Sequence, residues 1–134
     1  EEKMKNRLKK VIACAFAAMM VMGVSSTALA TSTNYTNKRI YGGASQTIMT
    51  GSRSRSNNVS QYVSSVNRNG QSGWKLRAYN HSTGGTCTDL VSITVVGGYN
   101  YANYTSKPAT VRVKNSIASS SSSSYLSFTG SVSV

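Results

Sequence analysis

Hydrophobic and polar residues alternate strictly along three stretches in the second half of the chain. Their apolar members are Trp74, Leu76 and Ala78; Val111 and Val113; and Leu126, Phe128, Gly130, Val132 and Val134. The residues between them are Lys, Arg, Tyr, Ser and Thr. A period of two with β-branched and aromatic residues is typical of strands that bury one face and expose the other. We therefore predict three half-buried antiparallel strands.

Two further apolar segments complete the pattern. Residues 59–66 form one run, and residues 90–96 form a more continuous run that is typical of a central strand. Clusters of Gly, Asn and Ser separate the segments, and no stretch after Ala30 shows a helical period. The pattern predicts an all-β domain, a small antiparallel β-sandwich or barrel of about six to seven strands.

The first 30 residues have a different character. A basic segment is followed by an apolar run at residues 11–24 and by Ala28-Leu29-Ala30, which are the three parts of a secretory signal-peptide helix cleaved after Ala30. The apolar run is shorter than the about 20 residues of a membrane-spanning helix. The expected organisation is a signal peptide at 1–30, with three residues before Met4, a flexible leader at 31–38 and a single β domain at 39–134. We expect a secreted, extracellular or cell-wall-associated protein with no transmembrane anchor after cleavage.

The scarcity of acidic residues excludes most chemistry that needs carboxylates. The chain carries 15 Lys and Arg against three Asp and Glu, a net charge of +12, and Asp89 is the one acidic residue after residue 30. One carboxylate cannot supply the pair that glycoside hydrolysis needs, and one each of His, Cys and Asp cannot form a closed zinc site or a calcium loop. His81 and Asp89 share a Gly- and Thr-rich segment without a Gly-x-Ser-x-Gly motif. We expect a protein that is not an enzyme and uses no metal or cofactor.

Cys87 is the one cysteine after Ala30, so the cleaved chain cannot form an intramolecular disulfide. It is then either a small residue packed in a loop or a thiol that pairs between chains. The sequence leaves the oligomeric state open.

Basic residues form three closely spaced pairs, which are Arg53 and Arg55, Lys75 and Arg77, and Arg112 and Lys114. We expect each pair on the polar face of a strand, and the last two pairs form one ladder if their strands share a sheet. Like charges on adjacent strands repel and are stabilised by a bound anion. The pairs are therefore candidate anion-binding residues for an anionic cell-wall polymer or a membrane surface, and the alternative is a solvated face that keeps the protein soluble. No nucleic-acid-binding module is visible, so we expect no sequence-specific nucleic-acid binding.

Tyr99, Tyr101 and Tyr104 alternate with Asn and Ala after a Gly pair. Aromatic rings in such a pattern stack on sugars while the amides bond to hydroxyl groups, which makes the three residues candidate glycan-stacking residues. The alternative is that they pack a long loop or a short strand.

Parts of the chain resemble small secreted single-domain β proteins of unknown function from Gram-positive bacteria, some of which are encoded near bacteriocin systems. The resemblance lies in the Ala28-Leu29-Ala30 signal end, in Trp74-Lys75-Leu76, and in residues 109–113 and 124–130. It implies a small exported β domain and transfers no catalytic residues.

The leading hypothesis is a secreted, cationic, non-enzymatic β-sandwich that acts at the bacterial cell envelope by binding anionic or glycan polymer. One alternative is a bacteriocin-associated or antimicrobial protein. The other is a self-assembling extracellular structural subunit, because the flat, Ser-rich C-terminal strand could join molecules edge to edge.

Overall fold

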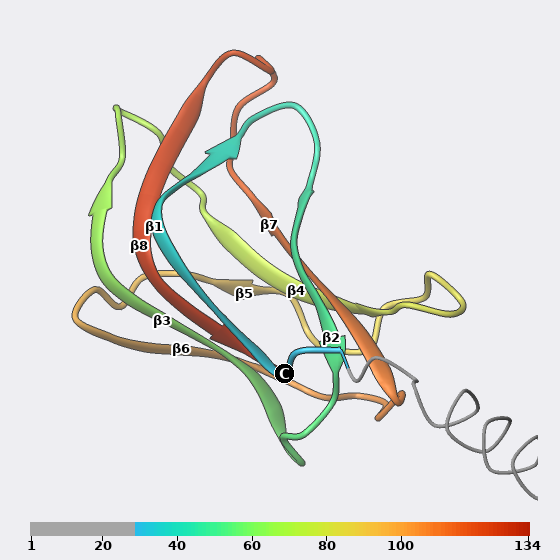
Figure 1. The fold of residues 1–134 in the computed structure, drawn as a ribbon. Coiled ribbons are helices and arrows are strands. Elements are labelled where there is room, and N and C mark those ends of the chain that lie inside the picture. Colours follow the sequence, from blue (N-terminus) through green and yellow to red (C-terminus); the bar gives the residue numbers. More distant parts are fainter. Residues whose placement is uncertain (1–28) are drawn as a thin grey trace, which may run out of the picture.

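The computed structural model describes residues 29–134, and the expected signal-peptide helix lies outside them. Eight strands form two four-stranded sheets (Figure 1). Sheet A has the order β1 (Ser32–Tyr41), β8 (Tyr125–Ser133), β3 (Asn58–Asn67) and β6 (Gly98–Asn103). Sheet B has the order β2 (Gln46–Ser52), β7 (Thr110–Ser116), β4 (Lys75–Asn80) and β5 (Val91–Ser92). All neighbouring strands are antiparallel.

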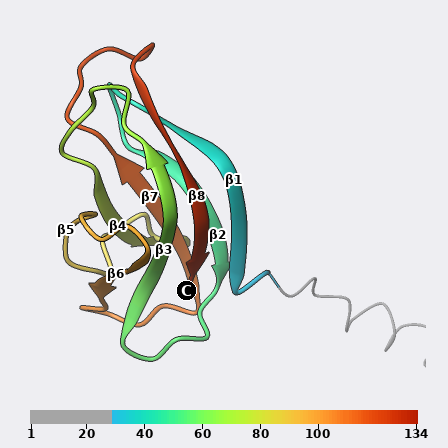
Figure 2. The same ribbon diagram turned by 90° about the vertical axis from the view of Figure 1, so that its left-hand side faces the viewer.

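The two sheets form an open sandwich of two layers, as the turned view in Figure 2 shows. The predicted all-β antiparallel fold is confirmed, with a sandwich in place of a closed barrel and with eight strands in place of six or seven. Among the described residues, no helix is long and apolar enough to cross a membrane.

Strand β1 corrects the prediction of a flexible leader at residues 31–38. Ser32–Tyr41 pairs with β8 along its length, with a bulge between Tyr35 and Lys38. The ring centroids of Tyr35 and Phe128 are 5.7 Å apart. The Tyr35 hydroxyl donates a hydrogen bond to the carbonyl of Ile48 in sheet B. The alternation of apolar and polar residues is weak in this strand, because Thr33 and Tyr35 occupy two of its core-facing positions. Periodicity therefore does not predict it.

The core lies between the two sheets, and the predicted alternation is confirmed there. Trp74, Leu76, Val111, Val113, Leu126, Phe128, Val132 and Val134 are buried. The rings of Trp74 and Phe128 meet with their centroids 5.2 Å apart, which joins sheet B to sheet A at the centre of the sandwich. Such tilted aromatic contacts add to the stability gained from burial.

Three polar side chains form a hydrogen-bonded network inside this core. The Gln61 Nε2 atom donates to Asn115 Oδ1, and the Asn115 Nδ2 atom donates back to Gln61 Oε1, each over 2.9 Å. Trp74 Nε1 donates to the same Asn115 oxygen over 2.9 Å. Gln61 belongs to β3 and Asn115 to β7, so the network links the two sheets.

The apolar run at residues 90–96 is not a central strand, contrary to the prediction. Only Val91–Ser92 pairs, as the edge strand β5, and Leu90, Val95 and Val96 are exposed. The Asn100 side chain replaces the missing sheet partners, because its Oδ1 atom accepts hydrogen bonds from the backbone N–H groups of Thr94 and Val95. This amide turns the chain away from sheet B and into β6.

Candidate binding surfaces

The pairing of β4 with β7 brings four basic residues to one face. Arg77 lies directly opposite Lys114, Lys75 opposite Ser116, and Arg112 opposite Tyr79. The residues that alternate with them are buried, so all four project from the outer face of sheet B. The structure therefore confirms the predicted shared face of Lys75, Arg77, Arg112 and Lys114, which we call the basic ladder.

Contacts within the basic ladder leave its charge largely uncompensated. Lys114 Nζ lies 4.9 Å from the centroid of the Tyr79 ring, and an Arg112 Nη2 atom donates to the carbonyl of His81 over 3.3 Å. The Nε atom of Arg77 is buried without a hydrogen-bond partner. In register with the ladder on strand β2 stand the hydroxyl-bearing Thr47 and Thr50, which add hydrogen-bonding groups to the same face.

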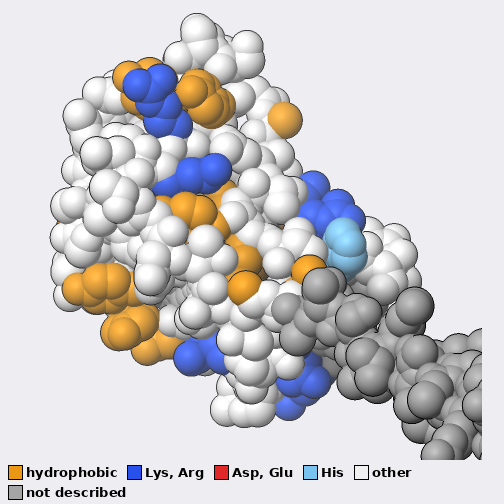
Figure 3. Space-filling view, in the orientation of Figure 1, with side chains coloured by type: hydrophobic (Ala, Val, Ile, Leu, Met, Phe, Trp, Pro, Cys, Tyr) orange, Lys and Arg blue, Asp and Glu red, His pale blue; other side chains and the backbone are white. Residues whose placement is uncertain are grey.

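Tyrosine rings take the place of carboxylates for several cations elsewhere. The chain has one acidic residue after residue 30. Lys38 Nζ lies 5.8 Å from the centroid of the Tyr35 ring. The Cζ atoms of Arg39 and Arg53 lie 4.5 Å and 5.9 Å from the ring centroids of Tyr125 and Tyr104, respectively. The negative face of an aromatic ring attracts a cation at these distances. The view in Figure 3 accordingly shows blue basic groups beside orange apolar ones and no red acidic groups.

Arg53 and Arg55 do not form a third pair on a strand face, which corrects the prediction. They lie in the loop between β2 and β3 and bond to neighbouring backbone, with Arg53 Nε donating to the Pro108 carbonyl over 3.0 Å. Arg55 donates to the Asn58 side chain over 2.8 Å. The loop lines an open depression of about 310 Å³ at residues 54–58. The alternating Ser-Arg-Ser-Arg pattern imitates a strand, but no apolar residues alternate with the arginines to bury one face.

Two of the three candidate glycan-stacking tyrosines lie in the open. Tyr99 and Tyr101 are 55% and 47% exposed on the outer face of β6, with ring centroids 6.0 Å apart and ring planes 14° apart. Tyr62 of β3 pairs with Tyr99, and their ring centroids are 5.0 Å apart. We call these three residues the tyrosine row. The signal for Tyr62 was present in the sequence, because it alternates with Val59, Gln61 and Val63, which face the core.

Tyr104 is a packing residue and not part of an exposed tyrosine surface. It is half-buried against the core, and its hydroxyl is buried without a hydrogen-bond partner. Burial raises the pKa of the Tyr104 hydroxyl to about 12. The structure therefore separates Tyr104 from the other two tyrosines.

The remaining reactive side chains do not assemble into a site. His81 and Asp89 are exposed, and Cys87 is completely buried, which raises the pKa of its thiol. Within residues 29–134, no three His, Cys, Asp or Glu side chains come together to hold a metal ion.

No protein-family model, curated protein or solved structure matches this chain. The candidate binding residues lie on the two outer faces of the sandwich.

Proposed function

We propose that this protein is exported and binds an anionic polymer of the bacterial cell envelope through the basic ladder, without catalysing a reaction. The observation that carries the proposal is the direct opposition of Arg77 and Lys114 on one sheet face. Like charges directly opposite each other on neighbouring strands destabilise a sheet. A bound anion between them turns this repulsion into attraction.

The arrangement favours a polymer over a small anion. The four basic residues are distributed over two neighbouring strands, which lie about 4.8 Å apart in a sheet, and along each strand at every second position. A chain with regularly spaced negative groups contacts several of these residues at once, and each contact adds to the binding energy. Wall teichoic acid has this chemistry outside a bacterial cell.

The start of the fold supports the proposed export. The first strand of the described residues begins at Ser32, directly after the expected cleavage position at Ala30, so cleavage leaves β1 to β8 intact. We expect mass spectrometry of culture medium to find a mature N-terminus at Thr31. The chain has a second cysteine, Cys14, in the apolar run at residues 11–24. A cell-retained form with lipid on Cys14 would contradict soluble export.

The decisive experiment compares two variants with the same loss of charge. One changes the basic ladder to serine (Lys75→Ser, Arg77→Ser, Arg112→Ser, Lys114→Ser). The control changes four other cations, namely Lys38, Arg39, Arg68 and Lys107, to serine. Both are tested for binding to purified cell walls with and without teichoic acid, and thermal melting verifies that both are folded.

We expect the parent to bind walls that contain teichoic acid, with binding that falls steeply as salt rises, because exposed charges are screened within about 8 Å at physiological ionic strength. The ladder variant loses this binding and the control retains most of it. Equal losses in both variants indicate a non-specific effect of net charge and contradict the proposal. Preferential binding to anionic phospholipid vesicles, together with inhibition of bacterial growth, favours the antimicrobial alternative.

The structural-subunit alternative loses the observation on which it was based. The C-terminal strand β8 lies between β1 and β3, so both of its edges are already paired. The sheet edges are instead β1, β6, β2 and β5. We expect no concentration-dependent fibres in light scattering.

A further inference from the structure

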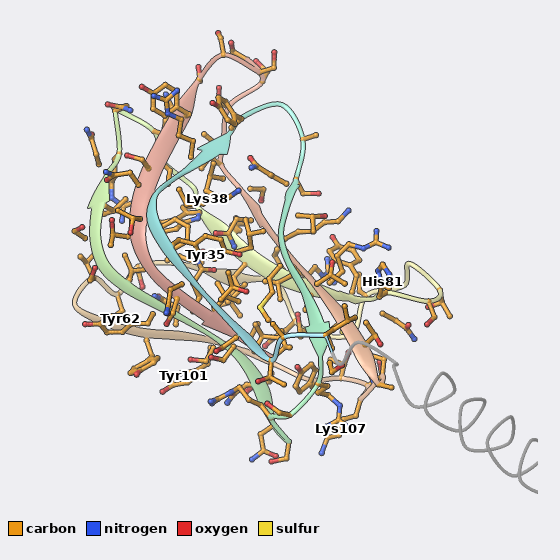
Figure 4. All side chains as sticks on the ribbon, viewed as in Figure 1. Tyr35, Lys38, Tyr62, His81, Tyr101 and Lys107 are labelled. Atoms are coloured by element: carbon orange, nitrogen blue, oxygen red, sulfur yellow. The ribbon has the colours of Figure 1, made fainter. Side chains whose placement is uncertain are left out.

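We infer that the tyrosine row is a second binding site, on the opposite sheet from the basic ladder, and that its ligand is a neutral glycan. Tyr62 and Tyr101 lie on one side of the molecule, over β3 and β6, whereas His81, beside the basic ladder, lies on the other side (Figure 4). The same region appears as an apolar patch in Figure 3.

The register of sheet A surrounds the tyrosine row with uncharged hydrogen-bonding groups. Two rows of directly paired residues cross the four strands in the order β6, β3, β8 and β1. The first row is Tyr101, Ser60, Ser133 and Ser32. The second row is Tyr99, Tyr62, Ser131 and Asn34. Directly paired residues share a sheet face. Ser60 is buried, with 3% of its surface exposed, so the accessible hydroxyl and amide groups beside the aromatic rings are those of Ser32, Asn34, Ser131 and Ser133. Neither row contains a charge.

The rings of the tyrosine row differ from the other tyrosines in their surroundings. Tyrosines outside the tyrosine row lie near Lys or Arg side chains, namely Tyr35, Tyr41, Tyr79, Tyr104 and Tyr125. Tyr99 and Tyr101 are also the two most exposed large aromatic side chains in the described part of the chain. Exposed apolar surface that serves no packing role commonly marks a binding site.

Backbone features hold the tyrosine row in place. Asn100 is buried between Tyr99 and Tyr101, and its hydrogen bonds to the backbone of Thr94 and Val95 fix β6. Because side chains alternate along a strand, an inward Asn100 directs both tyrosines outward. A Cβ atom at Gly130 would collide with the backbone carbonyl of Tyr62, so the glycine permits the close approach of β8 and β3 beneath Tyr62.

The chemistry of this face fits a neutral sugar polymer. The face of an aromatic ring is electron-rich, and it attracts the polarised C–H groups on the flat side of a pyranose ring. Serine hydroxyls and an asparagine amide can both donate and accept hydrogen bonds, as sugar hydroxyls require. Single-stranded nucleic acid would need several cations beside the stacking rings. The two paired rows contain none, and Arg55, beside the next pair of Asn58 and Asn103, donates its hydrogen bond to the Asn58 side chain.

Because the two sites lie on opposite sheets, one molecule can hold an anionic polymer and a neutral glycan at the same time. This bridging role rests on the proposed function of the basic ladder, whereas glycan binding by the tyrosine row does not. The protein would then link two components of an envelope.

The first test measures binding of three neutral hexasaccharides to the purified protein by calorimetry, namely β-1,4-linked oligomers of N-acetylglucosamine, glucose and xylose. The test variant is Tyr99→Ser/Tyr101→Ser. The control is Tyr41→Ser/Tyr125→Ser, which removes another pair of neighbouring tyrosines from sheet A, with centroids 5.7 Å apart.

We expect at least one hexasaccharide to bind with an affinity that changes little with salt. The test variant should lose about tenfold or more, as expected when about 1.4 kcal/mol of ring contact is removed, and the control should bind like the parent. The inference is overturned if none of the three sugars binds, or if both double variants lose the same amount of affinity for the sugar. It is also overturned if the parent forms a dimer that the test variant abolishes, because the exposed tyrosines are then a contact with a second copy. Binding to neutral phospholipid vesicles in place of sugars also overturns it.

The second test asks whether one molecule bridges two polymers. Labelled polyphosphate is mixed with the insoluble form of the sugar that binds, and the protein should carry polyphosphate into the pellet. The two proposals fail in different ways. If the tyrosine row is wrong, protein and polyphosphate stay together in solution, and if the basic ladder is wrong, the protein pellets without polyphosphate.

Discussion

Gln61 and Asn115 hold each other by two reciprocal hydrogen bonds of 2.9 Å across the interior of the sandwich, one residue from each sheet. Neither side chain is exposed. Buried amides are tolerated only when they are paired, so this contact favours one alignment of the two sheets over alternatives that would leave the amides without partners. Trp74 is tied to the same alignment through its indole N–H.

The first prediction concerns this network. Asn115→Ala leaves the Gln61 amide and the Trp74 N–H without their partner in the core, and each unsatisfied buried group costs about 1–3 kcal/mol. We expect a loss of about 2–5 kcal/mol in the free energy of unfolding, measured with urea. Gln61→Leu/Asn115→Leu should cost less than the sum of the two single leucine variants, because it removes both amides together. Additive losses would show that the amides do not depend on each other.

The second prediction concerns Trp74, which is 1% exposed and packs on Phe128. Trp74→Ala should destabilise the protein by about 3–5 kcal/mol, because it opens a cavity at the centre of the core. That is a large part of the stability of a small domain. The matched control is Tyr99→Ala, which shortens an exposed aromatic residue and should change the melting temperature little. Similar melting of the Trp74 variant and the parent would contradict the core assignment.

The third prediction concerns alkaline pH. Burial raises the pKa of Tyr104 from 10.0 to about 12 in the folded protein, so the fold favours the neutral phenol. The resulting stability is complete below pH 10 and is lost as pH rises from about 10 to 12, since only the unfolded chain ionises readily there. Tyr104→Phe should be at least as stable as the parent at pH 7, because it removes a buried hydroxyl without a partner. Urea unfolding from pH 9 to 12 should show a shallower decline for this variant, and identical slopes would exclude Tyr104 as a source.

The fourth prediction concerns Cys87. Its thiol is completely buried and its pKa is raised, so both access and thiolate formation are suppressed in the native state. We expect a thiol-specific reagent at pH 8 to react slowly with the native protein cleaved after Ala30, in which Cys87 is the one cysteine, and rapidly in urea. The protein should also migrate as a monomer on a non-reducing denaturing gel. Rapid native labelling or a disulfide-linked dimer would instead support pairing between chains.

The amino-acid sequence by itself determined the strands that bury one face. Trp74-Lys75-Leu76-Arg77 and Val111-Arg112-Val113-Lys114 specify both a strand and the side that faces water, because a period of two permits only one assignment once the apolar side is buried. The outward direction of these four basic residues was therefore predictable. The weakly apolar strand β1 was not, since Ser32–Tyr41 gains its stability from pairing with β8 and from the hydrogen bond of Tyr35 to Ile48.

Tertiary structure alone decided which strands became neighbours. No local pattern places Tyr62 beside Tyr99, Arg77 opposite Lys114, or Gln61 across from Asn115, because the members of each pair are at least 37 residues apart in the chain. The same holds for residues 90–96, where local hydrophobicity predicts a central strand and the amide of Asn100 provides competing hydrogen bonds. Periodicity fixes the direction of a side chain relative to its own strand, whereas the order of strands depends on the packing of the whole core. This order brings together the residues of both candidate binding surfaces.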